Sequence, residues 1–157
     1  MRERLSRGKR TDNDEGEFVY GIPVEGEVVD GVGNETYIIT NPGLQWVDGV
    51  FMTYDECIEV DPETVGDYTG LTDKNNKQIF EGDIVRLTDV HNEIEWTAVV
   101  AFGNPNGEYN WGWQLKAIGE FDGNKDILLW VDMEDTGAYC EVIGNIFDNP
   151  ELMKAQK

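Results

Sequence analysis

Asx-Gly dipeptides recur between short runs of β-branched and aromatic residues, and they constrain the fold of this chain more than any other feature. They occur at Asp30-Gly31, Asp48-Gly49, Asn106-Gly107 and Asp122-Gly123. Such pairs accept the positive φ angles of two-residue hairpin loops, whose twist matches the strands on either side. Eighteen glycines against five prolines also fit many tight turns. The sequence therefore predicts a mainly β fold built from antiparallel hairpins.

The first half of the chain is predicted to be β-rich from residue 17 to residue 67. Strand-like runs begin with EFVYGI and continue through PVEGEVV, TYIIT, LQWV and VFMTY. We expect Asn41-Pro42-Gly43 to form a type II turn between two of these strands, because proline presets the first central position and glycine accepts positive φ at the second. Residues 1–16 are polar and charged, and we expect them to be a flexible arm.

Residues 68–157 are predicted to form an SH3-like barrel with a short C-terminal helix. The runs EWTAVVAF, YNWGWQLKAI, DILLWVD and AYCEVIGNIF are expected to be strands. A glycine-bearing turn before an apolar strand, followed by several meandering strands, is typical of small barrels. Asn149 has the chemistry of a helix cap and Pro150 that of the first helical position, so a helical tail is expected to begin there.

Glycines and short polar residues at the predicted bends are expected to serve the backbone rather than a ligand. In the Val60–Leu87 stretch, Asp61 can cap a helical turn. Gly82 can make a bend with positive φ, and Asp83 beside it can accept hydrogen bonds from backbone N–H groups. The residues with this predicted structural role are Asp61, Pro62, Gly66, Thr69, Gly70, Glu81, Gly82, Asp83, Gly144, Asn145, Asn149 and Pro150.

Charge is strongly unbalanced along the chain. Twelve Lys and Arg against 32 Asp and Glu give a net charge of −20. Residues 1–10 hold five bases and one acid, a net charge of +4, so the remaining residues carry −24. Such a body repels phosphates, which weighs against direct binding of nucleic acid. We expect the basic arm to be drawn to the acidic surface of its own or a neighbouring copy, and to help hold a homo-oligomer together.

The two cysteines, Cys57 and Cys140, lie far apart in sequence, in no CxxC motif and with no histidine nearby. In an intracellular protein such cysteines are more often buried thiols than a disulfide. The basic N-terminus lacks the apolar run of a secretory signal, and no stretch reaches the apolar length of a membrane helix. We therefore expect a cytoplasmic protein with no membrane partner.

One loop opens like a calcium site. Asp122-Gly123-Asn124-Lys125-Asp126 has the D-x-N-x-D pattern, but Ile127 and Met133 stand where such a loop needs a glycine and a bidentate glutamate. A hairpin turn is the better interpretation, and no metal ligand is predicted.

Tryptophans in the second half could form an aromatic platform. Trp111 and Trp113, with Trp130 in a later strand and Glu108 nearby, have the composition of a carbohydrate site. Trp111 and Trp113 are two residues apart, so in a strand their side chains share one face. Packing in the core or in an interface is the simpler interpretation, and Trp111, Trp113 and Trp130 are the predicted contact surface. His91, in the polar run DVHNE, is predicted to lie at a hairpin tip. The sequence predicts no catalytic residue and no cofactor.

Several motifs resemble the YopX-like family of phage and prophage proteins. The blocks DPETVG, YTGL, DKNNK and IFEGDIV follow an opening RGKR and GEFVYG and precede a closing VIGNIFDNPEL. Asn76 stands where the family usually has glycine, and residues 24–54 and 87–141 match poorly, so nothing is carried onto them. The resemblance implies an SH3-like fold for the second half and a bacterial host cell carrying a phage or prophage. It implies no enzymatic site.

Three functions of different class fit the sequence. The first is a non-enzymatic phage or prophage accessory protein that acts through protein–protein contacts as a homo-oligomer, with a host or phage protein as a further partner. The second is an acidic mimic of DNA that inhibits a host nucleic-acid-binding protein, its carboxylates replacing phosphates. The third is a carbohydrate-active enzyme or sugar-binding module built around the tryptophans.

Overall fold

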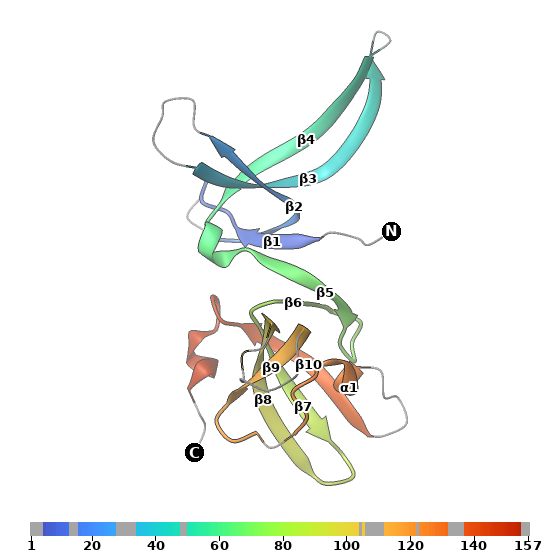
Figure 1. The fold of residues 1–157 in the computed structure, drawn as a ribbon, viewed down its shortest axis with the longest axis vertical. Helices are drawn as coiled ribbons and strands as arrows, with labels where there is room; N and C mark the ends of the chain where they lie inside the picture. Colours follow the sequence, from blue (N-terminus) through green and yellow to red (C-terminus); the bar gives the residue numbers. More distant parts are fainter. Residues whose placement is uncertain are drawn as a thin grey trace. The chain divides into compact units, whose positions relative to one another are not determined.

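The computed structural model describes residues 5–12, 16–27, 34–47, 50–103, 105, 112–121, 123–131 and 137–154 (Figure 1). For residues 26–27, 34, 41–47, 50–57 and 129 it describes the backbone alone. The chain divides into two compact units, Met1–Tyr68 and Thr69–Lys157. The described strands form two antiparallel sheets, which confirms the mainly β prediction.

The first unit is built from antiparallel hairpins. Its elements are β1 (Ser6–Lys9), β2 (Phe18–Glu27), β3 (Asn34–Val47), β4 (Val50–Val60), the 3-10 turn η1 (Pro62–Thr64) and the first residues of β5 (Gly66–Thr72). The strands of the larger sheet follow the order β4-β3-β2-β1-β5-β6. The last of them, β6 (Gln78–Phe80), belongs to the second unit by its residue numbers. Val47 of β3 pairs with Val50 of β4, so the predicted Asp48-Gly49 loop, itself outside the described residues, connects two paired strands.

Strand β1 lies where the sequence predicted a flexible arm, so that prediction is wrong for residues 6–9. The strand pairs with β2 on one side and with β5 on the other. Arg7 is only 5% exposed, and its guanidinium lies 4.3 Å from the centre of the Phe18 ring. A Cβ at Gly8 would come within 3.0 Å of the Val60 side chain. Because these contacts involve a glycine and a cation stacked on a ring, no apolar alternation marks the strand in the sequence.

The predicted type II turn at Asn41-Pro42-Gly43 is also wrong. Strand β3 continues through these residues, and its register with β4 shifts between Thr40 and Gly43. The three residues therefore lie at an irregularity within one long strand, a place where β-sheets tolerate both proline and glycine.

The second unit contains a four-stranded antiparallel sheet. Its further elements are β7 (Asp83–Asp89), β8 (Ile94–Gly103), β9 (Gly112–Ile118), the helical turn α1 (Leu128–Val131), β10 (Ala138–Asn145) and the 3-10 turn η2 (Pro150–Met153). The strand order is β10-β7-β8-β9. One face of this sheet carries the core, which includes Ile79, Val85, Leu87, Ala98, Val100, Leu115, Phe121, Ile127, Trp130 and Cys140. The alternate residues of the same strands point to the opposite face.

The structure does not confirm a closed SH3-like barrel. Among the described strands, β10 and β9 are the edges of the four-stranded sheet and do not pair with each other. The β9 edge is covered only in part, by a bridge between Gln114 and Asp126 and by a hydrogen bond from the Leu115 N–H to the Lys125 carbonyl. The sheet is therefore open in the described part of the chain.

Two predicted elements near the C-terminus differ in the structure. Residues 126–132 were expected to be a strand, but Leu128–Val131 form the single helical turn α1, with Asp126 accepting a hydrogen bond from the Leu128 N–H. The expected C-terminal helix is one 3-10 turn, with Pro150 at its first position. The 3-10 form is common in such short pieces of helix. No helix in the described part of the chain is long and apolar enough to cross a membrane.

Candidate functional site

The predicted helical turn between the halves is η1. Asp61 is its N-terminal cap and accepts a hydrogen bond from the Glu63 N–H at 3.0 Å, and Pro62 occupies the first position. Val65 ends the turn, and Gly66 follows as the first residue of β5, paired with Arg7.

Strand β5 is anchored in a different way on each side of the unit boundary. The Tyr68 N–H donates to the Leu5 carbonyl at 2.8 Å, and Ser6 Oγ donates to Asp67 Oδ1 at 2.6 Å. Beyond the boundary, Thr69 Oγ1 donates to the Ile79 carbonyl at 2.8 Å. Gly70 follows with a φ of +83°, in the left-handed region that favours glycine.

The bend at Glu81-Gly82-Asp83 is held by backbone hydrogen bonds. Gly82 has a φ of +89°; its N–H donates to the Val100 carbonyl at 2.9 Å and its carbonyl accepts from the Ile146 N–H at 3.0 Å. Asp83 is 2% exposed, and its Oδ2 accepts from the Phe80 N–H at 2.8 Å. Glu81 is half-buried in the turn. The bend thus lies beside both β8 and the segment after β10.

The end of β10 forms a second network of side chain and backbone. Asn145 Oδ1 accepts hydrogen bonds from the Phe147 and Asp148 N–H groups, at 3.0 and 2.9 Å. Asn149 makes no side-chain cap to η2; its Oδ1 instead accepts from the Asn145 N–H at 3.2 Å. A Cβ at Gly144 would come within 2.5 Å of that Oδ1. These contacts serve the chain itself.

The three tryptophans of the predicted contact surface lie in different settings. Trp111 is outside the described residues. Trp113 packs partly against the core, and its ring meets Phe102, which is 57% exposed, at a centroid distance of 4.9 Å. Trp130 is 6% exposed in α1, and its Nε1 donates to the Asn124 carbonyl at 2.8 Å. Trp130 is therefore part of the core and not of an aromatic platform.

The calcium-like loop carries its own cation. Lys125 Nζ donates to the carbonyl oxygens of Phe121 and Gly123, at 2.5 and 3.1 Å, and lies 4.0 Å from the centre of the Phe121 ring. The ammonium is thus held by backbone carbonyl groups and an aromatic ring of its own loop. Among the described residues no cluster of His, Cys, Asp and Glu suits a metal ion.

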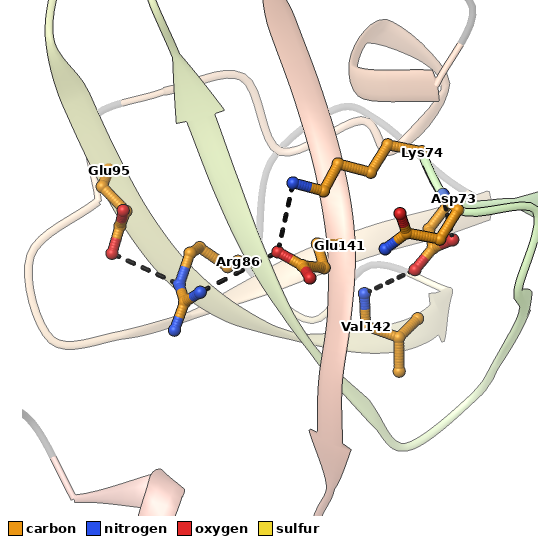
Figure 2. A network of polar contacts seen from close by, with 7 residues as sticks. Asp73, Lys74, Arg86, Glu95, Glu141 and Val142 are labelled. Atoms are coloured by element: carbon orange, nitrogen blue, oxygen red, sulfur yellow. Dashed lines mark hydrogen bonds and ion pairs between the residues drawn. The ribbon is translucent and has the colours of Figure 1, made fainter.

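Asp73 is a structural residue that was not among those predicted from the sequence. It is 6% exposed, and its Oδ1 accepts hydrogen bonds from the Asn75 and Lys77 N–H groups, at 2.8 and 2.9 Å. Its Oδ2 accepts from the Val142 N–H at 2.9 Å, which joins the loop to β10 (Figure 2). The sequence signal for this role is the polar run DKNNK, which begins with Asp73 and is typical of a turn. In the structure Asn76 of this run has a φ of +62°.

Cys140 is a buried thiol rather than a reactive one. It is 1% exposed and forms no disulfide. Burial, together with the negative charges of Asp73, Asp83 and Glu141, raises the pKa of the Cys140 thiol to about 12. The Cys57 side chain lies outside the described part of the structure.

A charged row crosses the face of the second sheet opposite the core. Arg86 of β7 pairs in register with Glu141 of β10 and with Thr97 of β8. Arg86 Nε lies 3.3 Å from Glu95 Oε1, and its Nη1 lies 3.8 Å from Glu141 Oε2 (Figure 2). Lys74 Nζ approaches the same Glu141 oxygen at 3.4 Å. Arg86 is therefore held between two carboxylates.

A groove with a volume of about 580 Å3 lies on this face, and we call it the sheet groove. Arg86, Thr97 and Ile118 line it from three neighbouring strands. Ile143 from β10 and Leu152 from η2 add apolar surface. Glu95, Glu120 and Lys154 bring charges to the same groove.

The first unit contains a second exposed feature, the far end of the β3–β4 hairpin. Strand β2 pairs with β3 only from Asn34 to Ile39. From Gly43 to Val47, β3 pairs with Val50–Tyr54 of β4 and with no other described strand. We call this two-stranded part the ribbon. Figure 1 shows it extending past β2 in the first unit.

Comparisons with known proteins give a family and a fold. A crystal structure of protein EF1440 from Enterococcus faecalis is similar, with a TM-score of 0.56 and 20% sequence identity over 98% of this chain and all of that one. At this identity the likeness concerns the fold alone. None of the curated proteins matches the chain. The family model described as YopX protein matches residues 34–154, most of the chain, and includes residues 34–54 and 87–141, where the motifs were weak. The chain belongs to the YopX family.

Proposed function

We propose that this is a non-enzymatic accessory protein of a phage or prophage, acting in the host cytoplasm through protein–protein contacts as a homo-oligomer. Membership of the YopX family supports the phage setting, through the resemblance described above. The observation that carries the oligomer is the ribbon, a pair of strands with no third strand beside it in the described chain.

An isolated two-stranded ribbon is marginally stable in water, so a long one needs a surface to pack against. Its sequence contains Leu44, Trp46, Val47, Val50, Phe51 and Met52. Aromatic residues and methionine are enriched in protein interfaces, where charged residues are depleted from the core. The ribbon has that composition.

Charge also favours the ribbon as the point of contact between copies. Two chains of net charge −20 repel each other, and the cost is lowest where acidic residues are few. From Thr36 to Tyr54 the only charged residue is Asp48. A second copy meeting the first at the ribbon would bury apolar surface while keeping most carboxylates in water.

Light scattering on the full chain tests the proposal. We expect a mass at least twice the 17.8 kDa of a single chain. A shortened variant, in which an Asn-Gly turn replaces residues 41–55, joins the registered pair Thr40 and Glu56. It should have the mass of one chain while keeping the β-type circular dichroism. Phe102→Ser removes an exposed aromatic ring elsewhere and should leave the assembly unchanged. A wild-type monomer would reject the oligomer, and an oligomer that survives the shortening would reject the ribbon.

The charge distribution favours a second candidate, an acidic mimic of DNA. Residues 11–68 contain 15 Asp and Glu and no Lys, Arg or His. A pull-down from host lysate separates the candidates. A mimic should capture nucleic-acid-binding proteins at low salt and lose them at high salt, because exposed charges are screened.

A further inference from the structure

We propose that two copies of the chain join their β4 strands edge to edge, about a twofold axis at Met52, so that one sheet runs through both ribbons. This arrangement rests on the proposed function and adds to it the edge and the register of the contact. Strand β4 is the last strand in the order β4-β3-β2-β1-β5-β6, so one side of it has no neighbouring strand in the described chain.

The covered end of β4 shows which backbone groups the strand directs to this side. There the Glu59 carbonyl accepts a hydrogen bond from the Thr11 N–H at 3.0 Å, with β3 on the other side. Successive residues of an edge strand direct their N–H and C=O groups alternately toward the neighbouring strand and away from it. The register shift in this pair places its extra residue on β3, so the alternation along β4 continues. Phe51 and Thr53 therefore present their backbone groups at the open edge.

The other strand edges of the described chain are covered or short. At β10 the Lys74 N–H donates to the Cys140 carbonyl at 3.0 Å, and at β9 the Leu115 N–H donates to the Lys125 carbonyl at 2.7 Å. Strand β6, at the far end of the larger sheet, has only three residues. The edge that a second copy offers to β4 is therefore its own β4. Contact between two identical edges about a twofold axis closes on itself, whereas contact between unlike surfaces can continue into a filament.

Charge restricts the register of this pairing. Residues 50–54 of β4 are uncharged, whereas Asp55, Glu56 and Glu59 follow them. A twofold axis at residue 55, 56 or 57 would place Asp55 opposite Asp55, Glu56 opposite Glu56, or Asp55 opposite Glu59. Like charges directly opposite each other destabilise a sheet. An axis at residue 53 or 54 would bring both Asp55 and Glu56 against the uncharged segment of the other copy and remove part of their hydration. The axis is therefore expected at the centre of the uncharged segment.

An axis at Met52 pairs the uncharged segment with itself. Val50 of one copy lies opposite Tyr54 of the other, and Phe51 lies opposite Thr53. Because Phe51 and Thr53 present their backbone groups at the edge, each such pair exchanges N–H···O=C hydrogen bonds between the copies. The combined sheet has the order β3-β4-β4-β3 at this point. Four strands exceed the two-stranded ribbon, which is marginally stable when isolated in water.

Disulfide trapping in the full chain tests the register, in a Cys57→Ser background where the remaining Cys140 is buried. Met52→Cys should link two copies on mild oxidation, because Met52 faces its counterpart in a non-hydrogen-bonded pair with Cα atoms about 4.5 Å apart. Gln45→Cys is the matched control. Gln45 pairs with Met52 across the ribbon, but three strand spacings, about 14 Å, would separate it from its counterpart. We expect about tenfold more linked chain from Met52→Cys than from Gln45→Cys. Equal linking of the two variants, as in face-to-face packing, would overturn the edge pairing.

Thr53→Pro tests the hydrogen bonds between the copies. The Thr53 N–H is directed away from β3, so proline removes no hydrogen bond within the chain, and sheets tolerate proline at such edge positions. Light scattering over a dilution series should show association weakened by about tenfold, while the β-type circular dichroism is kept. The control Thr53→Ser retains the N–H and should associate like the wild type.

The two levels of the proposal fail in different ways. A wild-type chain that is a monomer would reject the proposed function and the edge pairing together. A wild-type oligomer in which Met52→Cys does not link the copies, or in which the proline and serine variants associate equally, would overturn the edge pairing alone.

Discussion

At the scale of single residues, Gly82 gives the most direct test of the fold. Its φ of +89° is strained for any residue with a Cβ, although a Cβ there would meet nothing closer than 3.6 Å. Gly82→Val should therefore destabilise the protein through the backbone alone, by about 1–3 kcal/mol, with Gly82→Asn less affected. Urea denaturation measures both variants. A valine variant as stable as the parent would show that the bend has another conformation.

Cys140 gives a second test, of burial. In a Cys57→Ser background we expect no reaction with a thiol reagent at pH 8 until urea unfolds the chain, because the pKa of the folded thiol is about 12. The folded pKa lies above the ordinary value of 9.0, so stability is unaffected by this group below pH 9. Stability should then fall between pH 9 and 12, as the unfolded chain alone loses the proton. The Cys140→Ala variant should lack the part of this loss of stability that comes from the thiol. Rapid labelling of Cys140 in the folded protein would contradict the prediction.

At the scale of elements, Asp73 ties a loop to a strand. Three backbone N–H groups donate hydrogen bonds to the Asp73 carboxylate. In Asp73→Asn the side-chain NH2 group would face at least one of these N–H groups, and that hydrogen bond would be lost. Losing a hydrogen bond to a buried charged group costs about 1.5–3 kcal/mol, and we expect that loss in urea denaturation. Glu93→Gln, in an exposed turn, is the control. If both variants unfold at the same urea concentration, the stability of the loop does not depend on the Asp73 carboxylate.

The loop around Lys125 should depend on its internal cation. Lys125→Met removes two hydrogen bonds to carbonyl oxygens and a contact with the Phe121 ring. We expect a loss of about 1–3 kcal/mol and a shifted tryptophan emission, because Trp130 donates to the adjacent Asn124 carbonyl. Lys116→Met, on an exposed position of β9, should change stability by less than about 0.5 kcal/mol. Added calcium that restores the Met variant would show that the loop is a metal site after all.

Local chemistry in the sequence predicted some of these elements and missed others. The β3–β4 hairpin agrees with the Asp48-Gly49 pair between its strands, whereas Asp122-Gly123 is followed by the helical turn α1. The roles of Asp61 and Pro62 agree with their chemistry as a cap and a first helical residue. The strand β1 was missed because Gly8 and Arg7 gain their stability from residues that are distant in sequence. The sheet groove was also beyond prediction, because register across three strands brings Arg86, Thr97 and Ile118 together.

At the scale of the whole molecule, the net charge of −20 should oppose folding by self-repulsion. Raising NaCl from about 10 to 200 mM shortens the Debye length from about 30 Å to less than 10 Å. We expect the melting temperature to rise, with each 1 kcal/mol gained corresponding to about 2–4 °C for a chain of this size. Scanning calorimetry decides the sign. A melting temperature that falls with salt would mean that ion pairs such as Arg86–Glu95 outweigh the repulsion.

Strand β5 has a practical consequence for anyone who wishes to produce the halves of this protein separately. The boundary between the units falls between Tyr68 and Thr69, inside a continuous strand rather than in a linker. An expression clone ending at residue 68 would leave one fragment with a truncated edge, and the complementary clone would start with an unanchored end. Overlapping clones that both retain residues 66–72 are the better choice for isolating either fragment.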